Sequence, residues 1–169
     1  PTRRSPDLHG DPALRMNPRP GPDFIVDAST VSFEPAVVSS RLDSFSINFA
    51  INNLGRKVTD SFFVQVEQEL PGGDRVSLIR QWVAAPGFGD RYSFRVPCFG
   101  AIAAGLNRIY IEVDTEGTVE ELPGPAAEMN NRLQSGGRDG VSLFIIDNSA
   151  QPVYPPDFGI VNQAQVTLK

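Results

Sequence analysis

Apolar and polar residues alternate one by one along several stretches of this chain. The clearest stretch is residues 45–51, in which small or polar residues separate four large apolar ones: Phe45, Ile47, Phe49 and Ile51. Successive side chains of a strand point to opposite faces, so this pattern predicts a strand with one face in a core and the other in water. The same alternation predicts further strands at residues 62–69, 91–96 and 107–114.

The other apolar segments are shorter or less regular. Residues 24–33 predict a first strand with a break at residues 28–30, and Pro35 ends it, which suits the edge of a sheet. Residues 76–83 predict a strand with apolar residues on both faces, so the pattern leaves its inward face open. Residues 141–146 are too few for a helix and rich in β-branched residues, which predicts the last strand.

Six or seven short strands separated by turns predict an all-β fold, namely an immunoglobulin-like antiparallel β-sandwich of about seven strands. The 15 glycines and 15 prolines among 169 residues favour the same class, because they supply many turns. We expect three parts: a linker and the tail of an upstream domain at residues 1–22, the sandwich at 23–147, and a linker with the first strand of a partial following β-domain at 148–169. The chain is therefore expected to be a fragment of a longer protein.

Charge and hydropathy exclude two classes of partner. The net charge is -5 at pH 7, and lysines and arginines form no basic stripe, which argues against nucleic-acid binding. The longest apolar stretches are far shorter than the roughly 20 residues that span a bilayer, so no membrane insertion is expected. The expected partners are the neighbouring domains of the same chain.

The chain has one cysteine, Cys98, and one histidine, His9. No intrachain disulfide is possible, so packing must stabilise the fold. A thiol peptidase needs its cysteine and histidine in hydrogen-bond contact. Because His9 lies in a proline-rich linker and Cys98 follows a strand end, we expect a buried or idle thiol and no catalytic residue.

The loop at residues 114–131 is the most acidic part of the chain, and it is too long for a simple turn. Carboxylate and amide oxygens are ligands that suit calcium. The candidate ligands are Asp114, Glu116, Glu128 and Asn130, with Asn131 beside them. A solvated loop whose asparagines bond the backbone is the favoured alternative, and no other cofactor is expected.

Four aromatic residues raise a second possibility for binding. Trp82, Phe88, Tyr92 and Phe99 would form a platform for a glycan or a peptide if they lay together on the surface. Sandwiches of this class commonly bury aromatic side chains between their sheets, so packing in the core is the favoured interpretation.

Four segments, taken in order, resemble the cell-adhesion-related domain of bacteria (CARDB), an immunoglobulin-like module repeated in large surface proteins. They are PDFIVDASTVSF, FSINFAINNLG, GLNRIYIEVD and AEMNN, which together span residues 22–131. The similarity extends to about residue 146. The acidic loop of that family is usually shorter and more regular, whereas residues 122–127 interrupt it here.

Two flanking segments resemble parts of larger proteins. LHGDPALR at residues 8–15 is similar to the segment that closes the peptidase domain of gingipain-like cysteine peptidases. VYPPDFGIVNQAQVTLK at residues 153–169 is similar to the segment found after such a sandwich in exported Bacteroidetes proteins of the type IX secretion route. The order peptidase, sandwich and further β-domain is typical of those proteins.

The resemblance implies a secreted or cell-surface parent of the gingipain-like cysteine peptidase kind, in which this chain is a non-catalytic spacer or interaction module. The family's cysteine and histidine lie upstream of the closing segment, so no catalytic residue is carried over. Two alternatives stay open. In the first, the chain is a ligand-binding module, which binds calcium through the acidic loop, or a glycan, a peptide or a surface protein through its aromatic residues. In the second, the chain completes an upstream peptidase.

Overall fold

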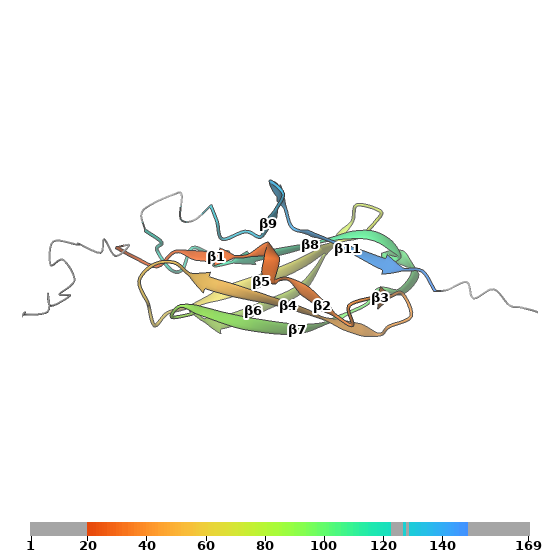
Figure 1. Cartoon of the computed structure of the whole chain (residues 1–169), viewed down its shortest axis with the longest axis horizontal. Helices are drawn as coiled ribbons and strands as arrows, with labels where there is room; N and C mark the ends of the chain where they lie inside the picture. The colour runs from red at the N-terminus through yellow and green to blue at the C-terminus, as the bar shows by residue number, and fades with distance from the viewer. Residues whose placement is uncertain (1–19, 123–126, 128, 149–169) are drawn as a thin grey trace, which may run out of the picture.

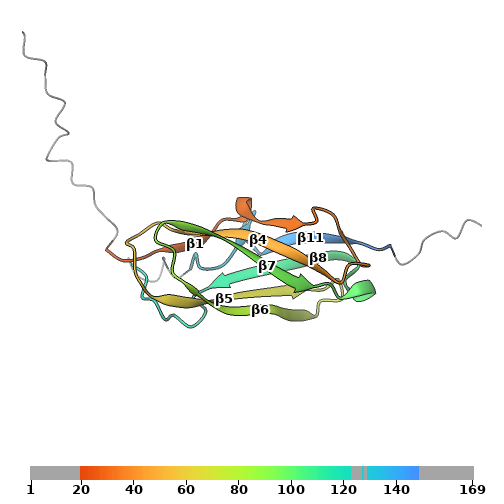
Figure 2. The same ribbon diagram turned by 90° about the horizontal axis from the view of Figure 1, so that it is seen from below.

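The structure is a computed structural model that describes residues 20–122, 127 and 129–148. Two β-sheets pack face to face into an elongated sandwich (Figures 1 and 2). Two short 3-10 helices, η1 (Ala28–Thr30) and η2 (Gly100–Ala103), connect strands. The described part of the chain contains no helix that is long and apolar enough to cross a membrane. The predicted all-β, immunoglobulin-like sandwich is confirmed.

The four-stranded sheet is built around β4 (Ser44–Asn53). β7 (Gly89–Pro97) pairs with one edge of β4, and β1 (Phe24–Val26) and β2 (Ser32–Glu34) pair one after the other with its opposite edge. All these pairings are antiparallel. Because η1 separates β1 from β2, the two act as one interrupted edge strand, as the sequence predicts.

The five-stranded sheet has the order β3-β11-β8-β5-β6. Its strands are β3 (Val38–Ser39), β11 (Val141–Ile146), β8 (Gly105–Val113), β5 (Ser61–Glu69) and β6 (Arg75–Ala84). Neighbours are antiparallel except β3 and β11, which are parallel. A small hairpin of β9 (Gln134–Ser135) and β10 (Arg138–Asp139) orders part of the long segment between β8 and β11.

The core lies between the two sheets and consists of the residues that the alternation predicts to face inward. The apolar members of β4, β5 and β8 at these positions are buried: Phe45, Ile47, Phe49, Ile51, Phe62, Val64, Val66, Ile109, Ile111 and Val113. The Phe24 and Phe62 rings join the two sheets, with centroids 4.8 Å apart. Full burial of one such side chain contributes roughly 1.5–3 kcal/mol, so these strands carry most of the stability.

A β-bulge in β6 explains why the sequence leaves the inward face of this strand open. The pairing with β5 shifts between Val66 and Glu67, so that Leu78 is an extra residue in β6. The shift changes the face of the following residues, because side chains alternate along a strand. Val76 before the bulge and Ile79 after it therefore both pack against the core.

The described chain enters and leaves the sandwich at opposite ends of its long axis (Figures 1 and 2). At one end, Gly21 O accepts a hydrogen bond from the backbone N–H of Arg56 at 2.8 Å, just after β4. At the other end, Ile146 O accepts from the backbone N–H of Ser40 at 2.9 Å, just after β3. Both ends of the described chain are thus bonded to the body of the sandwich.

Candidate functional site

Asp114 begins the acidic loop directly after β8 and holds its first turn. It has a φ of 48°, the only positive φ of a non-glycine residue in the described part of the chain. Its Oδ1 accepts hydrogen bonds from the backbone N–H and the hydroxyl of Thr118, at 2.8 and 2.7 Å. Its Oδ2 accepts from the Val119 N–H at 2.9 Å. Both carboxylate oxygens of this buried residue therefore stabilise the first turn of the loop.

Glu116 lies on the outer side of the same turn. Its carboxylate accepts a hydrogen bond from the guanidinium of Arg80 on β6. The guanidinium in turn lies over the Phe63 ring, 4.5 Å from its centroid. Glu116 therefore ties the loop to the outer face of the five-stranded sheet, where the ion pair is partly exposed.

Asn130 lies on the returning part of the loop and bonds the residue before β1. Its side-chain Nδ2 donates to Oδ1 of the buried Asp23 at 2.7 Å. Glu121, also buried, accepts a hydrogen bond from the Phe24 N–H at 2.6 Å. Asn53 Oδ1 accepts from the Asp23 N–H at 3.2 Å. We call Asp23, Asn53, Glu121 and Asn130 the β1 polar network, because they attach the loop to the first strand.

The three described calcium candidates, Asp114, Glu116 and Asn130, thus bond different partners. Glu128 lies outside the described residues. Within the described ranges, no group of three or more His, Cys, Asp or Glu side chains is placed to hold a metal ion. A hollow of about 490 Å³ beside the loop is lined by Asp114, Asn131 and Asp139, together with the cationic Arg132 and the apolar Met129. Calcium binding stays a prediction.

Three buried polar residues are not predicted from the sequence, although the alternation along the strands indicates them. Asn53, Gln68 and Asn107 continue the inward positions of β4, β5 and β8, and all three are buried. Gln68 Nε2 donates to Asn107 Oδ1 at 2.8 Å, and Asn107 Nδ2 donates to Ala103 O at 2.7 Å. Extending the alternation to the strand ends would have identified them, because a polar residue at an inward position needs a partner.

Cys98 is half-buried and follows β7. Its Sγ donates to Ser39 O at 3.6 Å, which places the thiol against the turn after β3. His9 lies outside the described residues. The described surroundings of Cys98 are therefore those of a packed thiol.

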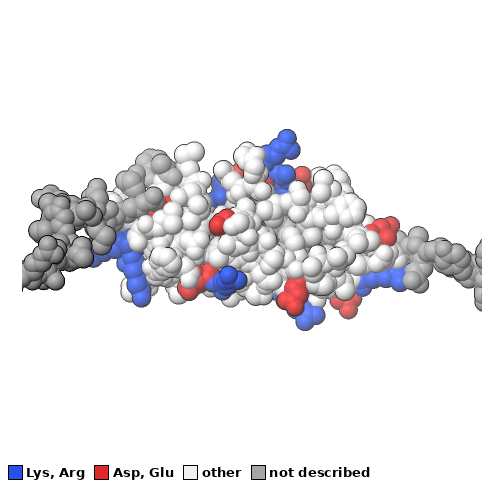
Figure 3. Space-filling view, viewed as in Figure 1, with Lys and Arg blue, Asp and Glu red and all other residues white. Residues whose placement is uncertain are grey.

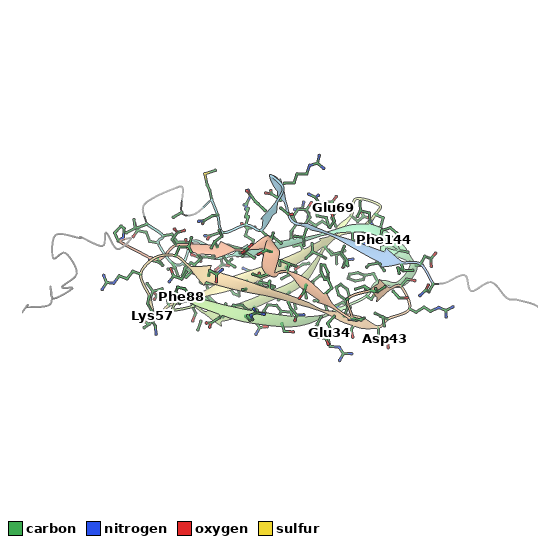
Figure 4. All side chains as sticks on the ribbon, viewed as in Figure 1. Glu34, Asp43, Lys57, Glu69, Phe88 and Phe144 are labelled. Carbon is green, nitrogen blue, oxygen red and sulfur yellow. The ribbon has the colours of Figure 1, made fainter. Side chains whose placement is uncertain are left out.

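The four aromatic residues of the predicted platform lie in different settings. Tyr92 and Phe99 are partly buried and pack against the core, as the favoured interpretation predicts. Trp82 is 49% exposed on the outer face of β6, and its ring lies 4.3 Å from that of Phe63. Phe88 is 86% exposed in the loop before β7 (Figure 4).

The outer face of the five-stranded sheet carries a second group of charged and aromatic side chains. Tyr110 Oη donates to Glu69 Oε2 at 2.5 Å, and the Arg75 guanidinium lies 3.9 Å from the Tyr110 ring centroid. The hydrogen bond from Tyr110 lowers the pKa of the Glu69 carboxyl and raises the pKa of the Tyr110 phenol. On the face drawn in Figure 3, described charges of both signs are scattered among uncharged residues.

No protein-family model matches this chain, and no curated protein matches its sequence. Among solved structures, the chain is similar to the CARDB domain of a Pyrococcus furiosus protein in complex with di-metal ions. The TM-score is 0.54 at 22% identity, over 76% of this chain and 92% of that one. A domain of a Methanosarcina acetivorans protein, named as a cell-surface protein, gives a TM-score of 0.49 at 24% identity, over 74% and 92%. The first similarity shows that the chain has the immunoglobulin-like fold of a CARDB domain.

Proposed function

We propose that this chain is a non-catalytic spacer and interaction module of a secreted or cell-surface protein. The observation that carries the proposal is the placement of the chain's entrance and exit at opposite ends of the sandwich (Figures 1 and 2). A module connected in this way separates the part of a protein before it from the part after it. Because its strands share one packed core, it also holds the two sides at a defined distance.

A replacement experiment in the parent protein tests the spacer role. Residues 20–148 are exchanged for an unrelated immunoglobulin-like sandwich whose chain ends also lie at opposite ends, and in a second variant they are deleted. We expect the exchange to preserve the activity and surface display of the parent and the deletion to impair them. If the exchange fails as completely as the deletion, the particular surface of this module matters, which supports the interaction role and contradicts a role as a spacer alone.

We further propose that the parent is an exported, gingipain-like peptidase protein. Residues 8–15 and 153–169 support this through their resemblance to segments of such proteins, and both lie outside the described residues. Recovery of the intact parent from the source cells tests the proposal. We expect it in the outer-surface or secreted fraction, with peptidase activity that a thiol-alkylating reagent abolishes. An intracellular parent without such activity would contradict it.

Calcium binding by the acidic loop is a second candidate function. It is supported by the carboxylates of Asp114 and Asp139 that line one hollow beside the loop and by the metal ions bound to the Pyrococcus furiosus CARDB domain. With the affinity of extracellular modules, about 10⁻⁴ to 10⁻³ M, one millimolar calcium would add about 0.4–1.4 kcal/mol. We expect a melting temperature about 1–5 °C higher in calcium than in chelator. Equal melting temperatures, or the same rise with magnesium, would dismiss a calcium site.

A further inference from the structure

Four exposed apolar side chains lie together at the end where the described chain leaves the sandwich. Leu106 on β8 and Phe144 on β11 are direct partners across the two strands, and they are 63% and 64% exposed. Ile146 is two residues beyond Phe144 on the same face, and it is 38% exposed. Val37, 63% exposed, directly precedes Val38, which pairs with Ile145. We call these four residues the exit patch.

The exit patch lies on β8 and β11 and reaches the residue before β3, and these three strands are adjacent in the sheet. Phe144 projects from β11 near the point where the chain leaves (Figure 4). Single exposed apolar residues are ordinary on a protein surface, but a group that crosses several strands marks an interaction site. We therefore expect another apolar segment to cover the exit patch.

The departing chain starts beside this patch. Asn148 is held against the turn after β3, because its N–H donates to Ser40 Oγ at 3.3 Å and its Nδ2 to Ser39 Oγ at 3.1 Å. The residues after it contain an apolar, proline-rich run, Val153-Tyr154-Pro155-Pro156. This run is the first apolar segment after Asn148.

We propose that residues 152–156 dock on the exit patch and thereby fix the direction in which the following part of the protein leaves. This inference rests on the proposed role as a spacer and adds how one of its two connections is held. The occupant is this segment of the same chain, with Val153 and Tyr154 covering Phe144 and Leu106.

Distance and entropy both favour this occupant. Five extended residues from Asn148 to Val153 reach about 17 Å, whereas crossing from β3 to β8 takes two strand spacings, or about 10 Å. Pro152, Pro155 and Pro156 restrict the free segment, so it loses less conformational entropy on docking than a flexible linker would. Docking through a local segment also avoids the translational entropy that a separate partner loses.

Backbone order parameters and nuclear Overhauser effects of the whole 169-residue chain test the proposal. We expect the backbone amides of Val153 and Tyr154, the two residues of this segment that carry an N–H, to show order parameters of about 0.85, and Tyr154 protons to show Overhauser effects to the Phe144 ring. In F144S and in L106S the order parameters should fall below about 0.6 and the Overhauser effects should vanish. F88S is the matched control, because Phe88 is an exposed phenylalanine toward the opposite end of the sandwich (Figure 4).

Three outcomes would overturn the docking. The first is an order parameter below about 0.6 at Val153 and Tyr154 in the unaltered chain, the second is no change in F144S, and the third is an equal change in F88S. A sedimentation coefficient that rises with protein concentration in the unaltered chain, but not in F144S, would show that a second copy of the chain covers the patch instead. The result is distinguishable from failure of the spacer role, because the order parameters are measured in this 169-residue chain by itself, whereas the replacement experiment measures the activity and surface display of the parent.

Discussion

Among single residues, the buried pair Gln68 and Asn107 shows how this sandwich accommodates polar groups in its core. Gln68 makes one described hydrogen bond, and its Oε1 has no partner among the described residues. Asn107 makes three, because its Nδ2 also donates to Gly105 O at 3.0 Å. We therefore expect Asn107 to contribute more than Gln68 to the free energy of unfolding.

We predict that N107L costs about 2–3 kcal/mol of unfolding free energy and Q68M within about 1 kcal/mol. N107L leaves the Ala103 and Gly105 carbonyls and the Gln68 amide without this partner. Q68M leaves one buried acceptor, Asn107 Oδ1, without this donor, and it also removes an oxygen that lacks a described partner. Urea unfolding of both variants and of the double variant measures these effects. A larger loss in Q68M than in N107L would show that the assignment of bonds is wrong.

The Tyr110–Glu69 hydrogen bond leads to a prediction about pH. Because the folded-state pKa of Glu69 is lowered, its contribution is complete above the unfolded pKa of about 4 and is lost as pH falls through the lowered pKa. Because the pKa of Tyr110 is raised, its contribution is complete below about pH 10 and is lost as pH rises through the raised pKa. The pair thus stabilises the fold between these limits.

Replacing Tyr110 by phenylalanine should return the pKa of Glu69 toward its ordinary value. The variant loses the donor that favours the ionised carboxylate, although Arg75 stays nearby with its guanidinium 3.6 Å from Glu69 Oε2. Carbon-13 detection of the carboxyl group during an acid titration measures the change. Y92F is the control, because the Tyr92 hydroxyl bonds the Ala84 carbonyl at 3.4 Å. The same shift in both variants would contradict the prediction.

Among the elements, the connection from β10 to β11 depends on Gly140. Its φ is 77°, a conformation that L side chains rarely adopt, and a Cβ would lie 2.6 Å from Ile109 O. Gly73, in the β5–β6 hairpin, has a φ of 90° but open space where a Cβ would stand. Comparing the two glycines separates backbone strain from the steric clash.

We predict that G73A costs about 1–2 kcal/mol and G140A about 3 kcal/mol or more. Both variants force an L residue into positive φ, and only G140A also pushes against the backbone of β8. Thermal or urea unfolding measures the difference. Equal losses would mean that the β10–β11 connection moves away from β8 freely.

At the scale of the whole molecule, the sandwich should behave as a rigid spacer. Arg41 and Arg56 are exposed residues close to the two ends of β4. β4 has 10 residues, so it spans about 33 Å. Spin labels at cysteines in positions 41 and 56, in a C98S background, should therefore lie about 33 Å apart or more, with one narrow distance distribution. Double electron–electron resonance measures it, and a broad or bimodal distribution would contradict a rigid spacer.

The sequence predicts the acidic loop of the candidate site, but it does not predict which residues the loop contacts. Its length and charge identify it as the exceptional connection, and its oxygen-bearing residues Asp114 and Glu116 are among the calcium candidates. The partners of these residues cannot be predicted, since Asp114 bonds Thr118 and Val119 whereas Glu116 bonds Arg80 on a different strand. Hydrogen bonds of this kind depend on the path of the backbone, which residue types do not specify.

The sequence by itself determined which residues face the core of β4, β5, β7 and β8, because the two-residue period of a strand depends only on neighbours along the chain. Only the tertiary structure decided the bulge in β6 and the attachment of the loop to β1. The Asn130–Asp23 bond joins residues 107 positions apart, and the Phe24–Glu121 bond joins residues 97 apart. Such contacts form when the sheets pack, and they have no periodic signal in the sequence.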